Sequence, residues 1–491
     1  MKRPKIIVIG SGFAGLACAT SLAQFGYDVQ IIEKNDQPGG RARKFEKNGF
    51  VFDMGPSWYW MPDVFETYFN RFGKKSGDYY QLSRLDPSYQ VFFSQDDSLN
   101  IPADFNQLVQ LFEQIEAGSG ELLRKFLLEA AYKYEVGINK LVYKPGRSLT
   151  EFMSFKLLYD LFRLDLFTSF HKHIRKFFQH EKLLQLMEFP ILFLGATSEK
   201  TPALYSLMNH ADMNLGTWYP QGGMHKIIEG MVALAKEKGV KFNLNETVTG
   251  FDWVDNKITA VKTSKGYHET EVVVAGADYH HVEQHLIPER LRTYTQNYWD
   301  KRVMAPSALI YYVGIDKKLN NLLHHNLFFD EDFKVHSHQI YENPQWPEKP
   351  LFYVCVPSKT DRSVAPEGHE NLFFLMPVAP NLDDNEQIRE KYFNLMLDRL
   401  ESLTRQSVRE NIVYKKSYAH SNFVSDYNSF KGNAYGLANT LKQTALLKPS
   451  LKSKKVNNLF YTGQLTVPGP GVPPSLISGQ VAASEVDKFL K

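Results

Sequence analysis

The residues with the clearest chemical use form a glycine-rich turn near the start of the chain, Gly10-Ser11-Gly12-Phe13-Ala14-Gly15. Gly10 permits a tight turn, Gly12 lets the backbone approach a pyrophosphate, and Gly15 lets a helix pack closely on a strand. The free N–H groups of a helix that begins at Phe13 and Ala14 can donate to phosphate oxygens. The spacing therefore predicts a dinucleotide-binding site.

The segments around this turn have the patterns that such a site needs. Residues 6–9 form an apolar, β-branched run typical of a buried parallel strand. A helical face follows and ends near Gly26, and residues 29–32 predict a second strand. Glu33 comes 18 residues after Gly15 and can accept hydrogen bonds from a ribose diol, which disfavours a 2′-phosphate. Lys34, which follows, completes this group of candidate cofactor-binding residues.

A second glycine pair, Gly39-Gly40, comes shortly after Glu33 and leads into Arg41. Paired glycines let the chain pass close to a ligand, and an arginine there can face a phosphate or a ring. Arg43 has two open interpretations, a ligand contact or a solvated charge. A turn follows at residues 53–57, where Gly55 and Pro56 are further candidates for cofactor contact.

This order of motifs resembles the FAD-binding region of the amine oxidase and phytoene desaturase superfamily: GxGxxG, then Glu, then GGR, then a D-x-G-P turn. The resemblance implies FAD rather than NAD as the cofactor. Asp53, the acid of that turn, is the one weak candidate for a catalytic residue, and it has a second interpretation as a structural cap of the Gly55-Pro56 turn.

The C-terminal segment predicts a strand at 458–461, a Pro/Gly loop and a helix over about 475–490. The helix start offers N–H donors to an anionic partner. The segment resembles the C-terminal signature of bacterial-type phytoene desaturases, which implies further cofactor contacts at Gly463, Gln464, Gly471, Val472 and Pro473. Many relatives have an acidic or small residue at Gln464, so that assignment is the least secure of the five. No cysteine lies near this loop, which disfavours a covalent flavin link.

Residues 216–224 contain a Tyr-Pro-x-Gly-Gly element that also resembles the desaturase family. By that resemblance Val248 lies near the adenine, although its residue type alone favours plain core, and Ala277-Asp278 lie at the edge of the cofactor domain. The predicted fold class is α/β. A discontinuous Rossmann-type FAD-binding domain spans about 1–100, 216–285 and 440–491, a helical subdomain 101–215, and an antiparallel-sheet substrate domain 286–439.

Aromatic residues recur at spacings of three or four through the helical region, from Phe152 to Phe177, with Lys and Arg on other faces. Such a helix can lie in a membrane interface or pack on a core, and both interpretations stay open. Aromatic residues are 14% of the chain, which suits either a roomy apolar site or an aromatic core. Trp58, Tyr59, Trp60 and Trp218 are candidates for lining such a site.

Charge and cysteine usage exclude several classes of protein. The formal net charge of +3 is too small to indicate nucleic-acid binding. The two cysteines, Cys18 and Cys355, predict a reducing compartment, and neither their spacing nor that of the histidines indicates a metal site. We read no signal peptide and no run near the ~20 apolar residues of a spanning helix. The expected location is the cytoplasm, at the surface of a membrane.

Resemblance over the whole chain implies a bacterial-type phytoene desaturase that uses FAD to convert phytoene toward lycopene. The flavin accepts a hydride from a CH–CH bond, and a quinone or oxygen reoxidises it. No base is assigned: His210 and His225 flank the 216–224 element, but lone histidines are more often structural. Alternatives are desaturation of a hydroxylated or C30 carotenoid, redox-neutral carotenoid isomerisation and, less favoured, amine oxidation. The oligomeric state is not predicted.

Overall fold

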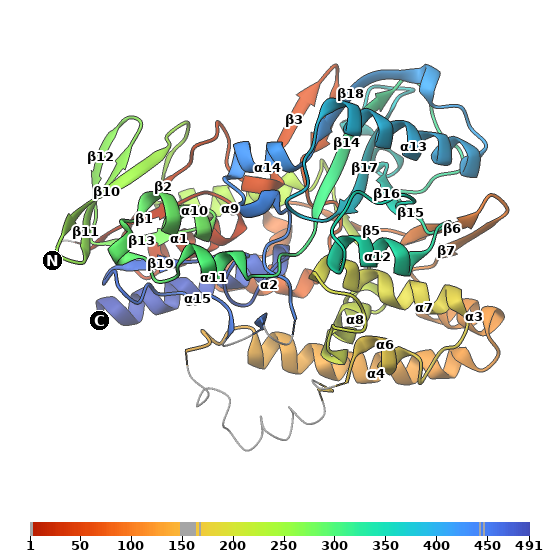
Figure 1. Cartoon of the computed structure of the whole chain (residues 1–491), viewed down its shortest axis with the longest axis horizontal. Helices are drawn as coiled ribbons and strands as arrows, with labels where there is room; N and C mark the ends of the chain where they lie inside the picture. The colour runs from red at the N-terminus through yellow and green to blue at the C-terminus, as the bar shows by residue number, and fades with distance from the viewer. Residues whose placement is uncertain (1–2, 148–163, 166–167, 441–442, 445–446) are drawn as a thin grey trace.

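The computed structural model describes residues 3–147, 164–165, 168–440, 443–444 and 447–491. Two sheets organise the chain, and a layer of helices lies beneath the larger sheet (Figure 1). The five-stranded sheet is parallel, and its strands come from three distant segments of the chain. In sheet order they are β19 (Leu459–Tyr461), β13 (Val272–Ala275), β1 (Lys5–Ile9), β2 (Asp28–Ile32) and β9 (Lys241–Asn243).

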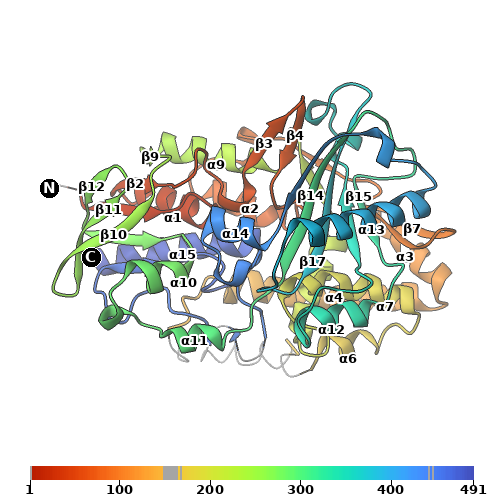
Figure 2. The same cartoon turned by 45° about the horizontal axis from the view of Figure 1, so that its top comes forward.

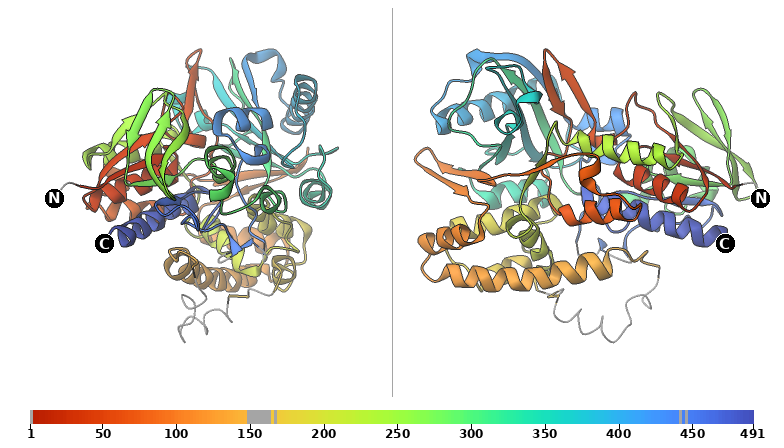
Figure 3. Two further views of the ribbon diagram at one scale, coloured as in Figure 1. Left: turned by 60° about the vertical axis from the view of Figure 1, so that its left-hand side comes forward. Right: turned by 180° about the vertical axis from the view of Figure 1, so that it is seen from behind.

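Helices from opposite ends of the chain cover this sheet together. Helix α1 (Phe13–Gln24) packs on α15 (Val472–Leu490), and α9 (His225–Glu237) lies on the other side of α1. Helices α1 and α15 approach so closely that a Cβ on Gly479 would lie 2.2 Å from the carbonyl oxygen of Ala14. Both chain ends consequently lie at the same side of the molecule (Figures 1 and 3).

The seven-stranded sheet is antiparallel except for one pair, β15 with β6. In sheet order its strands are β18 (Ile412–Tyr418), β14 (Ser307–Ile315), β17 (Glu370–Val378), β16 (Phe352–Cys355), β15 (His325–Phe328), β6 (Tyr89–Ser94) and β7 (Asp97–Ile101). Strands β14 and β17 form its centre (Figure 2).

Strands β14 and β17 are buried on both faces along their whole length, which explains why they are largely apolar. On β14, Leu309, Tyr311 and Val313 pack toward helix α13 (Glu386–Thr404). Their neighbours Ala308, Ile310 and Tyr312 belong to the core shared with the helical layer. The helices of that layer are α3 (Phe105–Ile115), α4 (Ser119–Val136), α6 (Phe170–Ile174), α7 (Glu181–Glu188) and α8 (Leu207–Met213).

Smaller elements connect these units. The further strands are β3 (Lys44–Lys47), β4 (Phe50–Asp53), β5 (Leu82–Arg84), β8 (Trp218–Pro220), β10 (Val248–Val254), β11 (Lys257–Thr263) and β12 (Gly266–Glu269). The further helices are α2 (Pro62–Asn70), α10 (Tyr279–His281), α11 (Gln296–Asp300), α12 (Phe333–Tyr341) and α14 (His420–Tyr427).

The α/β fold class is confirmed. The predicted cofactor domain extends too far toward residue 100, because β6 and β7 join the seven-stranded sheet and not the cofactor unit. That pairing is long-range and leaves no local signal in residues 89–101. The start of the aromatic segment at Phe152 lies outside the described residues, whereas Phe170, Ile174 and Phe177 are buried in the core. Among the described residues, no helix is both long and apolar enough to cross a membrane.

Candidate cofactor and substrate site

One large cavity opens between the two sheets, and it brings the predicted motifs together. All predicted cofactor-binding residues except Gly15 line it: Gly10, Gly12, Phe13, Ala14, Glu33, Lys34, Gly39, Gly40, Arg41, Gly55, Pro56, Val248, Gly463, Gln464, Gly471, Val472 and Pro473. They come from the carboxyl ends of parallel strands and from two helix N-termini, which is the usual ligand edge of an open α/β sheet.

The first glycine turn is shaped by contacts behind it and open space in front. Gly15 faces away from the cavity, where a Cβ would lie 2.0 Å from the carbonyl oxygen of Gly10. Gly10 has φ +90°, and its Cβ would crowd the amide of Ala277 at 3.2 Å. A Cβ on Gly12, in contrast, would meet nothing within 4 Å. The turn is thus built to keep its backbone bare on the cavity side.

The arginine loop lies directly beside this turn. The amide of Gly39 donates to the carbonyl oxygen of Ser11 at 2.9 Å, and a Cβ on Gly40 would lie 3.3 Å from Gly12 Cα. Gly55 packs on the same loop, because its Cβ would lie 2.5 Å from the carbonyl oxygen of Arg41. Side chains at these glycines would push the two loops apart and open the floor of the cavity.

Glu33 is buried and holds the loop geometry. Its Oε2 accepts from the amide and the hydroxyl of Ser11 at 2.9 and 2.7 Å, and its Oε1 accepts from both nitrogens of Asn35 at 2.9 Å. A ribose diol would share these oxygens with Ser11 and Asn35. Lys34 lines the cavity but donates from Nζ to the carbonyl oxygen of Ser425 at 2.7 Å. Val248 lines the cavity and also belongs to the core, and its position near an adenine stays a prediction.

Arg41 carries a buried positive charge at the cavity wall. Its Nη2 donates to Ser429 Oγ at 3.0 Å, and its Nε has no partner. Burial lowers the pKa of this guanidinium, against the raising effect of nearby Tyr427 and Asp278. With the Gln464 amide oriented so that its oxygen faces Arg41, that oxygen accepts from Arg41 Nη2 at 2.9 Å. Because this neighbour is neutral, it positions Arg41 without cancelling its charge.

The N-termini of α1 and α15 line the cavity, and of the first three residues of α15 only Val472 has an N–H, because Pro473 and Pro474 lack one. The residues before α1 and α15, Gly12 and Gly471, make no side-chain cap, and the first residues of both helices line the cavity. Anions are stabilised at such helix ends. Together with Arg41, they supply the donors that a dinucleotide pyrophosphate needs. The bare glycine surface and this donor set fit FAD.

Apolar side chains from the second sheet and the helical layer form the rest of the cavity. No sequence pattern distinguishes these residues, because each one looks like ordinary core. They include Ile138, Val142, Tyr205, Leu207, Met208, Ala308, Ile310, Tyr353 and Leu375. Of the predicted aromatic candidates, Trp58 and Trp60 line the cavity, whereas Tyr59 and Trp218 do not.

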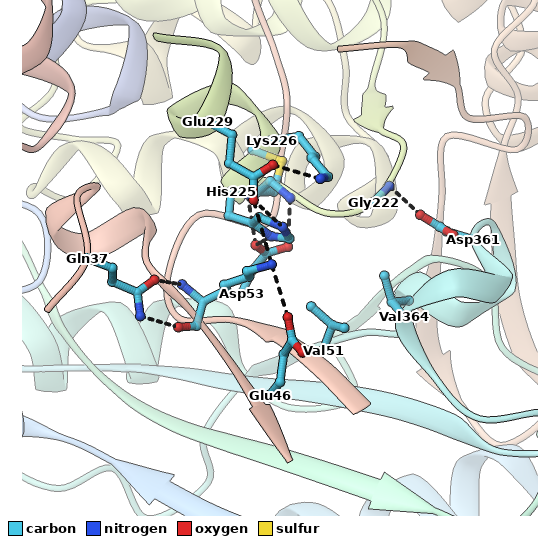
Figure 4. A network of polar contacts seen from close by, with 12 residues as sticks. Gln37, Glu46, Val51, Asp53, Gly222, His225, Lys226, Glu229, Asp361 and Val364 are labelled. Atoms are coloured by element: carbon cyan, nitrogen blue, oxygen red, sulfur yellow. Dashed lines mark hydrogen bonds and ion pairs between the residues drawn. The ribbon is translucent and has the colours of Figure 1, made fainter. Parts of the chain in front are cut away.

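Asp53 is a helix cap (Figure 4). Its Oδ2 accepts from the amide of Met224 at 2.7 Å, and its Oδ1 accepts from the amide of His225 at 2.9 Å and contacts the ring Nδ1 of the same residue at 2.9 Å. It does not line the cavity. The catalytic interpretation of Asp53 therefore has no structural support: it secures the start of α9 at the end of β4.

The remaining polar candidates also have structural partners. Arg43 does not line the cavity, but it pairs at 2.8 Å with Asp426, which does. His210 lies beside Asn214 at 2.9 Å, and burial lowers its pKa. Asp278 lines the cavity and caps α10 by accepting from the amide of His281 at 3.0 Å, and burial raises its pKa to about 6.

Comparison with known proteins adds a family to this geometry. The family described as flavin containing amine oxidoreductase matches residues 13–487. A carotenoid 3,4-desaturase of Haloarcula japonica is 43% identical, over 97% of this chain and 97% of its own length. A zeta-carotene-forming phytoene desaturase of Myxococcus xanthus is 31% identical, over 98% and 93%. An oxidoreductase of Methanosarcina mazei shares the fold, with a TM-score of 0.64, 16% identity and coverage of 99% and 100%.

Proposed function

Because this chain belongs to the flavin containing amine oxidoreductase family and is an FAD-dependent oxidoreductase acting on CH–CH bonds, we propose that it converts phytoene toward lycopene. Carotenoid desaturation is the activity of its class, and phytoene is the substrate that we assign. The observation that supports this most directly is the apolar half of the cavity, which is continuous with the glycine-lined half.

A hydrocarbon substrate explains the residues of that half. Phytoene offers no hydrogen-bond donor or acceptor, so it must be oriented by shape and apolar contact alone. Ala308, Ile310 and Leu375 supply such contacts from the second sheet, and Trp58 and Trp60 supply flat aromatic walls. When bound, FAD provides the hydride acceptor for a CH–CH bond. The apolar walls keep water away from the positive charge left on the polyene.

The carboxylates that line the cavity are poorly placed to act on the polyene. Glu33, Glu246 and Asp278 follow strands of the parallel sheet, and Asp426 pairs with Arg43. We therefore propose that no carboxylate of the second sheet serves as the base and that the proton leaves through solvent. We further propose that a quinone or oxygen is the electron acceptor, that the enzyme works at a membrane surface, and that it resides in the cytoplasm.

The second candidate is 3,4-desaturation of a later carotenoid, which the 43% identity to a carotenoid 3,4-desaturase favours. Expression in cells that accumulate phytoene separates the two. Progressively longer-wavelength pigments support phytoene desaturation, and unchanged phytoene refutes it. Parallel cells that accumulate lycopene test the second candidate, since one further double bond lengthens the chromophore again. Cells that carry the Gly12→Ala variant serve as the cofactor-deficient control.

A further inference from the structure

Three side chains that can bind a metal ion lie buried together where strands β15 and β16 pair. His325 on β15 is the register partner of Cys355 on β16, and His324 immediately precedes β15. One ring nitrogen of each histidine and Cys355 Sγ all lie within 4.8 Å of one another. The three residues are at most 4% exposed. Strand pairing brings them together, so no local spacing in the sequence indicates the cluster.

Each histidine ring has one nitrogen with a partner and one without. His324 Nδ1 contacts Thr360 Oγ1 at 2.8 Å, and His325 Nδ1 contacts the hydroxyl of Tyr353 at 2.6 Å. Nε2 of both rings is buried and has no hydrogen-bond partner among the described residues. Burying polar nitrogens in this way is costly, so native proteins seldom retain them unless something else binds them. Two such rings beside a buried thiol indicate a ligand that binds nitrogen and sulfur together.

This set of donor atoms selects a transition-metal ion. Imidazole and thiolate are ligands of Zn²⁺, with Zn–N and Zn–S distances of about 2.0–2.1 and 2.3 Å. Ligand atoms on a tetrahedral ion are therefore about 3.4–3.6 Å apart, a spacing that the three atoms reach by closing no more than roughly 1.5 Å. A metal-binding histidine almost always has a hydrogen-bond partner for its second nitrogen. The hydroxyls of Thr360 and Tyr353 can serve both rings in this way.

The surroundings can balance the charge of a divalent ion. Burial lowers the pKa of His324 to about 3, against the opposing effect of the charge on Asp361, so the ring is neutral and keeps a lone pair. Asp361 itself is held nearby, because its Oδ2 accepts from the amide of Gly222 at 2.5 Å (Figure 4). An ion that displaces the proton of the Cys355 thiol into solvent leaves a thiolate. That thiolate and the Asp361 carboxylate together carry the two negative charges that Zn²⁺ requires.

We propose that His324, His325 and Cys355 bind one Zn²⁺ ion that joins β15 to β16. The two imidazoles and the thiolate supply three of its four ligands, and water takes the fourth position. The ion fixes the ring of His325, which stacks on Trp58 with ring centroids 4.0 Å apart and planes 8° from parallel. Trp58 and Tyr353 both line the cavity, so the site holds two aromatic residues of its wall in place.

The first measurement is the metal content of the full-length protein, purified without a histidine tag and dialysed. Elemental mass spectrometry should find about one Zn²⁺ per chain. Cys355→Ala removes the thiolate and should reduce bound zinc by about tenfold or more. Cys18→Ala is the matched control, because it removes the other buried cysteine, which lies in α1, and should keep the zinc content of the wild type. Bound FAD per chain, measured by flavin absorbance, should be equal in all three proteins and shows that they fold.

Thr360→Val tests the hydroxyl that supports the site. Valine keeps the shape of the side chain and removes the partner of His324 Nδ1 without removing a ligand, so Zn²⁺ affinity should fall about 10–100-fold. Competition with a chromophoric chelator measures that affinity. Co²⁺ in place of Zn²⁺ should give the absorption of a tetrahedral site in the red, where oxidised flavin does not absorb. Cys355→Ala should lose this absorption.

A wild-type protein that contains no zinc and takes up none from micromolar Zn²⁺ would overturn the proposal. Unchanged zinc in Cys355→Ala would also overturn it, since the ion would then be bound elsewhere on the chain. One equivalent of copper or iron would show that the choice of Zn²⁺ is wrong. None of these measurements involves a carotenoid, so failure of the phytoene assignment would leave them intact.

Discussion

Replacing Gly12 with alanine should separate cofactor binding from folding. Gly12 precedes α1 with φ −71°, which alanine adopts freely, and its added Cβ meets nothing within 4 Å. Loss of chain entropy in the unfolded state favours Gly→Ala by about 0.4–1 kcal/mol. Alanine is a poorer helix cap than glycine by a similar amount, roughly 1 kcal/mol at most. The two effects offset each other, so the free energy of unfolding of the apo-protein should hardly change.

FAD binding should respond very differently. The new methyl group occupies the space through which a pyrophosphate reaches the amides of α1. Losing two hydrogen bonds to a charged group costs about 1.5 kcal/mol each at the low end. Since about 1.4 kcal/mol is a factor of ten, affinity should fall by at least about a hundredfold. Quenching of FAD fluorescence gives the affinity, and urea unfolding of the apo-protein gives the stability.

Gly15→Ala is the matched control. Its Cβ would lie 2.0 Å from the carbonyl oxygen of Gly10, so the strand and helix must separate, at a cost of about 1–3 kcal/mol or more. Gly15→Ala should therefore lose stability before any ligand is added, whereas Gly12→Ala should not. The reasoning fails if Gly12→Ala binds FAD as tightly as the wild type, or if it destabilises the apo-protein as much as Gly15→Ala does.

Three further changes test other parts of the structure. Asp53→Ala removes the cap of α9 and should lower the free energy of unfolding by about 1–2 kcal/mol. The folded fraction should keep its activity. A fully folded but inactive variant would instead show that Asp53 has a catalytic role. Ala308→Leu adds a larger side chain to the apolar wall of the cavity and should lower carotenoid turnover about tenfold, measured as pigment yield. FAD affinity, measured by flavin titration, should not change. Weaker FAD binding would contradict the placement of Ala308 in the apolar half. Burial raises the pKa of Asp212 to about 7, so the folded protein holds a proton that the unfolded chain releases near pH 4, and stability falls as pH rises through that window. Asp212→Asn should reduce that fall by up to about 1.4 kcal/mol per pH unit in urea unfolding at pH 5 and pH 7, and an unchanged slope would count against it.

The sequence predicted the cofactor half of the site far better than the substrate half. Gly10, Gly12 and Gly40 could be recognised because their role is local: each permits a backbone approach that follows from residue type and spacing. Ala308 and Leu375 could not, because an apolar residue in a buried strand looks the same whether it faces a core or a cavity.

Contacts between residues far apart in the chain explain two other differences between the sequence predictions and the structure. Strand β6 joins β15 across more than two hundred residues of chain, so the predicted boundary at residue 100 had no local basis. Asp53 lies in the recognised turn, but its partner is the start of α9, which lies 171 residues later in the chain. In both cases a tertiary contact decided what the residues do.

The packing of α1 on α15 has a consequence for how the protein is made. The glycine turn is synthesised well before its supporting helix, because α1 begins at Phe13 and α15 begins at Val472. Contacts of such high sequence separation form late and slowly. The cofactor cradle of the nascent chain is therefore incomplete until α15 has been synthesised and has packed on α1.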